Sequence, residues 1–129
     1  MQRQKRIVVA DDEPYIANLL ADLLEGEGYR VRVAYDGEQA LAAALEERPD
    51  LVVSDVMMPR RSGLQLVQAV RAEPALRDVP IVLTSAGRVP DICWPGVEFI
   101  PKPFQLEDIL ELTAQRTGKK ARGRPSSAA

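Results

Sequence analysis

Five side chains that could do chemistry together stand directly after short apolar runs of the sequence: Asp11, Asp12, Asp55, Thr84 and Lys102. Two unit charges 4 Å apart cost roughly 4 kcal/mol at an effective dielectric of 20, so gathered carboxylates need either a shared proton or a cation. Oxygen-only ligands suit a hard octahedral ion, which indicates Mg²⁺. With an ammonium and a hydroxyl nearby, such a group could hold a phosphoryl group and neutralise its charge.

The composition limits which other chemistries are open. The chain of 129 residues has no histidine, which excludes histidine-based zinc sites, Ser/His and Cys/His nucleophile pairs and a phosphohistidine on this chain. It has one cysteine, no long apolar run and no apolar signal segment after Met1, so the default location is cytoplasmic, with no membrane contact. Residues 1–117 carry 13 basic and 19 acidic side chains, whereas residues 118–129 carry four basic ones and no acid.

Five short, mostly β-branched runs alternate with helical patterns, which predicts a parallel sheet covered by helices on both faces. Runs one, three and four are continuously apolar, as in central strands, while Arg32 and Glu98 mark runs two and five as edges. The order 2-1-3-4-5, that of a flavodoxin-like doubly wound α/β fold, satisfies this pattern. The predicted strands are residues 7–10, 31–34, 51–54, 81–84 and 97–100.

The helices are read from apolar stripes and from capping residues. A stripe from Ile16 to Leu24 predicts the first helix, with glycines behind it as a stop. Asp36 and Ser62 are suited to cap the second and third helices. Between residues 86 and 96 a fourth helix can have only one or two turns, because Pro95 cannot lie inside it. The second helix is expected to turn Ala40, Leu41, Ala44 and Leu45 inward, and the last helix Leu106, Ile109 and Leu110.

The topology decides where the reactive side chains lie. All strands of a parallel sheet point the same way, so the residues that end them share one edge, and ligands bind there near the reversal of strand order. Here the reversal lies between runs one and three, which end in the three aspartates. We therefore expect a magnesium and phosphoryl site at this edge.

Four segments resemble motifs of the receiver domains of bacterial two-component response regulators, in particular stand-alone chemotaxis regulators. Residues 9–13 resemble the acidic pair, and residues 54–59 with Ser62-Gly63 resemble the phosphorylation-site motif. Residues 83–86 are similar to the hydroxyl-bearing strand end, and Lys102-Pro103-Phe104 resembles the K-P-F motif. The resemblance covers about residues 5–116, and it implies a receiver domain over residues 1–117 followed by a basic tail over residues 118–129.

The resemblance implies a role for the acidic residues. Asp55 would be the nucleophile that becomes an aspartyl phosphate, with a phosphohistidine of a sensor histidine kinase or phosphotransfer protein as donor. Asp12, Asp55 and the backbone carbonyl of Met57 would bind Mg²⁺ directly, and Asp11 would help through water. The chain would catalyse only its own phosphorylation and dephosphorylation, and its output would be contact with another protein.

The resemblance also implies roles around the phosphoryl group. Lys102 would pair with a phosphoryl oxygen, and the Lys102–Pro103 bond would be cis. Thr84 would hydrogen-bond the phosphoryl group and move with it, and Phe99 would be the aromatic switch, without the hydroxyl that a tyrosine would have. Because Met57 and Ala86 are apolar where the family flanks the attacking water, we expect slow loss of phosphate.

Other readings stay open on the sequence. A phosphate-independent interaction module on the same fold is one alternative. The complete set of three aspartates, Thr84 and Lys102 argues against it, while the stretch from Thr84 to Lys102, about one helical turn shorter than is typical of the family, argues mildly for it. An Asp-nucleophile phosphatase would need a second acid where Met57 stands. Residues 122–125, R-G-R-P, resemble an AT-hook that could contact DNA, although a disordered basic tail is the simpler interpretation. Arg60 and Arg61 are interpreted as a solvated corner, with a partner or phosphate contact as the alternative.

Overall fold

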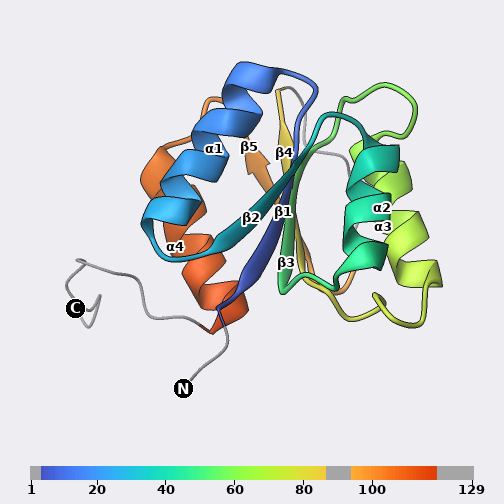
Figure 1. The fold of residues 1–129 in the computed structure, drawn as a ribbon. Helices are drawn as coiled ribbons and strands as arrows, with labels where there is room; N and C mark the ends of the chain where they lie inside the picture. The colour runs from blue at the N-terminus through green and yellow to red at the C-terminus, as the bar shows by residue number, and fades with distance from the viewer. Residues whose placement is uncertain (1–3, 87–93, 119–129) are drawn as a thin grey trace.

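The computed structural model describes residues 4–86 and 94–118. It contains a five-stranded parallel sheet in the order β2-β1-β3-β4-β5. Helices α1 and α4 cover one face of the sheet and α2 and α3 cover the other (Figure 1). The flavodoxin-like strand order and the two edge strands predicted from sequence are therefore confirmed. The strands are β1 (Arg6–Ala10), β2 (Arg30–Ala34), β3 (Leu51–Asp55), β4 (Ile81–Ser85) and β5 (Val97–Pro101); the helices are α1 (Pro14–Gly26), α2 (Gly37–Glu46), α3 (Gly63–Ala72) and α4 (Leu106–Thr117).

Side chains of the central strands alternate between two apolar layers. Val8 and Val52 join the cluster beneath α2 and α3, whereas Ile7, Val9 and Leu51 join the cluster beneath α1 and α4. Successive residues of a strand point to opposite faces, so runs that are apolar throughout are needed where both faces are covered. This double burial fixes the register and therefore the height at which each central strand ends.

The capping residues start their helices as predicted. The Asp36 side chain accepts a hydrogen bond from the Gln39 backbone N–H, and the Ser62 hydroxyl accepts one from Gln65 N–H. The Gln65 side chain in turn accepts from Ser62 N–H at 2.9 Å, which completes a capping box. The S-x-x-Q spacing was visible in the sequence, and these contacts fix where the chain turns into α3.

One prediction for the core of α2 was wrong. Leu45 is 51% exposed, and Ala43 is buried in its place beside Ala40 and Ala44. The buried face of α2 is thus centred on three small side chains, and Leu45 lies on the outward side of the helix. Leu41 is half-buried against the same cluster, as expected.

The connection between β4 and β5 is short. No helix occurs in its described residues, Ala86 and 94–96, and residues 87–93, where a short fourth helix was expected, lie outside the described part of the chain. Trp94 is half-buried against the cluster beneath α2 and α3. The Arg71 guanidinium donates to the carbonyl oxygens of Arg77, Val79 and Pro95 at 2.9, 2.7 and 3.0 Å, which ties the end of α3 to the start of β5.

No helix within the described ranges has both the length and the apolar character needed to cross a membrane. Thr117 ends α4, and Gly118 follows it with a left-handed φ of 74°. Residues 119–129, which are all of the predicted basic tail except Gly118 and include the R-G-R-P segment, lie outside the described part of the chain.

Candidate functional site at the carboxyl edge of the sheet

The three predicted aspartates meet at the carboxyl edge of the sheet. Carboxylate oxygens of Asp11, Asp12 and Asp55 lie within 4.8 Å of one another. Asp11 and Asp55 are buried, whereas Asp12 is exposed. They come together because β1 and β3 pair in parallel, with Ala10 opposite Ser54, so both strands end at the same height.

Lys102 reaches this cluster from the segment after β5. Its Nζ lies 3.4 Å from Asp55 Oδ1 and 3.6 Å from Asp11 Oδ2. The Lys102 backbone N–H donates to the Ser85 carbonyl at 2.7 Å, and the Lys102–Pro103 peptide bond is cis, as predicted. The sequence did not predict the hydrogen bond to the Ser85 carbonyl. It is a backbone contact, and it forms because β4 and β5 end side by side.

Asp55 is held in an environment that opposes its charge. Burial raises the pKa of the Asp55 carboxyl group and the neighbouring Asp11 raises it further, while Lys102 lowers it in part. One lysine cannot neutralise three carboxylates. Asp55 Oδ1 is also buried without a hydrogen-bond partner, although it is within ion-pair distance of Lys102.

This arrangement fits a hard divalent cation. An orphaned buried carboxylate oxygen and an oxygen-only donor set in negative excess are the features that Mg²⁺ requires of a protein site. A cation there would satisfy the oxygen and offset the repulsion that raises the Asp55 pKa.

Thr84 and Phe99 occupy different surroundings. Thr84 is buried at the end of β4 and is the register partner of Asp55, so the two side chains leave the sheet on the same face. Its carbonyl accepts from Val56 N–H at 2.9 Å. Phe99 is half-buried and packs into the cluster beneath α2 and α3, opposite Leu83. Thr84 therefore lies next to Asp55 on the neighbouring strand, whereas Phe99 packs on the opposite face of the sheet.

The loop after Asp55 is fixed at several points. Ser54 Oγ donates to the Asp55 carbonyl at 2.9 Å, and Gly63 N–H donates to the Val56 carbonyl at 2.9 Å. A Cβ on Gly63 would lie 2.4 Å from the Asp55 carbonyl oxygen, so only glycine permits this approach. The Met57 side chain is 71% exposed. These contacts hold the segment that carries the Met57 carbonyl, the backbone ligand expected from the sequence.

Arg60 makes a contact that the sequence did not reveal. Its Nε donates to Asp36 Oδ2 at 2.9 Å across 24 positions of the chain. Arg60 has a positive φ of 66°, which is uncommon for a residue with a side chain. Neither the pairing nor the backbone conformation follows from local sequence. Arg60 is exposed, as interpreted, although it also pairs with a buried carboxylate. Arg61 is half-buried with a buried Nε, so its interpretation as solvated was wrong in part.

Comparisons with known proteins show the family and the fold. The sequence model of one protein family, the response regulator receiver domain, matches residues 7–114 of this chain. The probable transcriptional regulatory protein TcrX of Mycobacterium tuberculosis is 37% identical over 121 residues, which cover 87% of this chain and 50% of that protein. The chain thus spans about half the length of the curated relatives that it matches.

Solved structures share the fold. The chemotaxis response regulator CheY4 of Vibrio cholerae aligns with a TM-score of 0.79 and 31% identity over 89% of this chain and 99% of that one. The receiver domain of the hybrid histidine kinase CckA aligns with a TM-score of 0.75 and 34% identity over 87% of this chain and 98% of that one.

Proposed function

Because the chain belongs to the response regulator receiver family, we propose that it accepts a phosphoryl group on Asp55 in a Mg²⁺-dependent reaction and thereby changes its protein-binding surface. The observation that carries the proposal is the buried Asp55 carboxylate, set among two further carboxylates and held 3.4 Å from Lys102 Nζ. The phosphoryl donor would be a phosphohistidine of a sensor histidine kinase or phosphotransfer protein, since this chain has no histidine of its own.

Three residues of the chain have separate roles in phosphoryl transfer. An Asp55 oxygen attacks phosphorus, and the bond from phosphorus to the donor nitrogen breaks. The Lys102 ammonium lies beside Asp55, where it can pair with a phosphoryl oxygen. Thr84 pairs with Asp55 in the register of β3 and β4, and its buried hydroxyl would donate a hydrogen bond to a second phosphoryl oxygen. Bound Mg²⁺ would supply Lewis-acid charge neutralisation, with Asp12, Asp55 and the Met57 carbonyl as direct ligands and Asp11 in support through water.

Two apolar side chains stand where the family flanks the attacking water. Met57 and Ala86 are both exposed and neither can position water by hydrogen bonding. We expect the aspartyl phosphate to be lost slowly. The proposed switch would involve Thr84 moving toward the phosphoryl group and Phe99 adjusting its packing in response.

The test is the intact mass of the protein after incubation with acetyl phosphate and Mg²⁺. The wild type should gain one phosphoryl group that is lost over minutes or longer, and the gain should vanish with a chelator. Asp55→Asn should gain none. Equal labelling of both proteins would place the modification elsewhere, and no labelling of a folded wild type would favour a phosphate-independent interaction module.

A second readout concerns Mg²⁺ alone. Burial and Asp11 raise the pKa of Asp55 above its usual value of 3.8, so the free energy of unfolding falls as the pH rises from 3.8 to the folded-state pKa, above which the charged carboxylate destabilises the folded state. Mg²⁺ at neutral pH should raise the melting temperature of the wild type more than that of Asp55→Asn. Equal shifts would argue against Asp55 as a ligand.

A further inference from the structure

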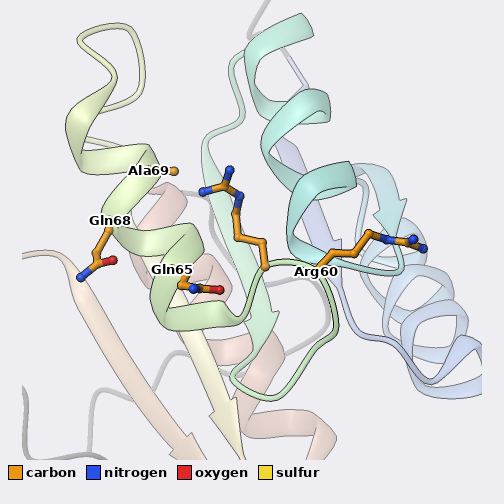
Figure 2. Close-up of a pocket in the computed structure, with 5 residues that line it drawn as sticks. Arg60, Gln65, Gln68 and Ala69 are labelled. Atoms are coloured by element: carbon orange, nitrogen blue, oxygen red, sulfur yellow. The ribbon is translucent and has the colours of Figure 1, made fainter.

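A polar pocket lies beside the loop that joins β3 to α3. Its volume is about 420 Å³, which is in the range of ligand sites. Figure 2 shows α3 supplying one wall through Gln65, Gln68 and Ala69. Two successive arginines of the loop, Arg60 and Arg61, complete the lining.

Arg60 does not supply the charge of this pocket. Its guanidinium is paired with the buried Asp36 carboxylate at 2.9 Å. Figure 2 shows its side chain pointing away from Gln65 and Gln68. The two arginines that look equivalent in the sequence are therefore different: both line the pocket, but the Arg60 guanidinium has an internal counter-ion.

Arg61 is left with an uncompensated charge. It is half-buried, and its Nε is buried without a hydrogen-bond acceptor. Within residues 4–86 and 94–118, no carboxylate lies within ion-pair distance of it. An arginine cannot shed its proton, and an unmet hydrogen bond from a buried charged donor is costly. Because the Nε is covered, an anion in the pocket would meet the terminal guanidinium nitrogens, and it would offset the unpaired positive charge rather than complete the Nε hydrogen bond.

The backbone holds this charge in place. Arg61 N–H donates to the Pro59 carbonyl at 2.7 Å. The Arg61 carbonyl lies so close to the first turn of α2 that a Cβ on Gly37 would be 2.1 Å from it. A ligand would meet a guanidinium whose backbone is already ordered, which lowers the entropic cost of binding.

The glutamines add neutral hydrogen-bonding groups. Gln65 uses its Oε1 to accept from Ser62 N–H, which leaves its amide NH₂ as a donor. Gln68 is exposed, one turn further along α3. We propose that this pocket binds a ligand through an oxyanion, a carboxylate or a phosphate, with Arg61 as its charge partner and the glutamine amides as further donors. This inference does not rest on phosphorylation of Asp55.

The proposal can be tested by nuclear magnetic resonance on the full chain without Mg²⁺. Inorganic phosphate and succinate would be titrated separately at constant ionic strength, while the Arg61 Nε–Hε signal and the Gln65 and Gln68 side-chain NH₂ signals are followed. Saturable shifts of these signals in either titration are expected, and the anion that binds more tightly identifies the class of ligand.

Variants make the assignment specific. Arg61→Gln should weaken binding by roughly tenfold to a hundredfold, as loss of a hydrogen bond from a charged donor predicts, whereas Arg61→Lys should retain part of the affinity. Arg77→Gln removes the same charge from an exposed turn outside the pocket and should leave affinity unchanged. The proposal is overturned if neither anion shifts the pocket signals of the wild type. It is equally overturned if the affinity of Arg61→Gln equals that of the wild type.

Discussion

The acidic edge of the sheet and the basic corner beside α3 are joined by one short loop, yet they hold excess charge of opposite sign. At the edge, three carboxylates face one ammonium. At the corner, Arg60 pairs with the carboxylate of Asp36, and Arg61 has no carboxylate of the described residues within ion-pair distance. Both excesses are partly shielded from water, where an unmatched charge costs more than at an open surface. This contrast is what the two proposals rest on: a cation at the acidic edge and an anion at the basic corner.

The largest expected effect comes from removing the one ammonium of the acidic edge. Lys102→Gln should lower the rate of phosphorylation by acetyl phosphate roughly 100-fold, because a preorganised positive group is lost where phosphoryl charge develops. Initial rates from intact mass would measure this. Lys5→Gln, which removes a distant lysine, serves as the charge-matched control. A Lys102→Gln rate within about twofold of the wild type would contradict the role given to Lys102.

The next largest effect is expected from adding a methyl group to one glycine beside each region. A Cβ at Gly63 would strike the Asp55 carbonyl and one at Gly37 would strike the Arg61 carbonyl, so Gly63→Ala and Gly37→Ala should each lower the free energy of unfolding by about 2–3 kcal/mol. Urea unfolding would measure both. Gly26→Ala, which meets nothing within 4 Å, should not destabilise α1.

Those two variants should differ in function. Gly63→Ala displaces the backbone of Asp55 itself and should slow phosphorylation, while Gly37→Ala should chiefly disturb anion binding at the Arg61 pocket. Equal loss of phosphorylation in both would mean that the loop moves as one piece and that the two regions are not separable.

The smallest expected effect concerns Asp36 and pH. The hydrogen bond from Gln39 N–H, with the paired Arg60, holds the pKa of Asp36 below its usual value of 3.8. A lowered folded-state pKa contributes stability above pH 3.8 that is lost as the pH falls through the folded-state value. Asp36→Asn keeps a good cap but not the charge, so wild type should be more stable at neutral pH, by less than about 1 kcal/mol because Arg60 is exposed.

Urea unfolding of Asp36→Asn and wild type between pH 7 and pH 3 would measure this difference. The gap should narrow as the pH falls below 3.8. A gap that stays constant across that range would show that the charge of Asp36 is not involved.

The acidic edge could be predicted from sequence because strand ends are local features. Asp11, Asp55 and Thr84 each follow an apolar run directly, and a parallel sheet must bring such residues to one edge. The basic corner could not be predicted in the same way. Its division into a paired Arg60 and an unpaired Arg61 depends on a positive φ and on a partner 24 residues away.

Burial within helices was predictable only in part. The stripe that placed Leu45 inside assumed a helix with a wide apolar face, but the buried face of α2 consists of Gly37 and three alanines, and Leu45 lies outside it. The rotation of a helix about its own axis depends on the sizes of the side chains that pack against the sheet. The spacing of apolar residues alone does not specify this rotation.

The Arg71 contact explains why a shortened connection does not disturb the site. The guanidinium holds the Pro95 carbonyl just before β5, and β5 then follows β4 residue for residue from Val97 onward. The position of Lys102, at the far end of that strand, is thus set from Pro95 forward, so the chain ahead of Pro95 can gain or lose residues in evolution or by design without displacing the lysine.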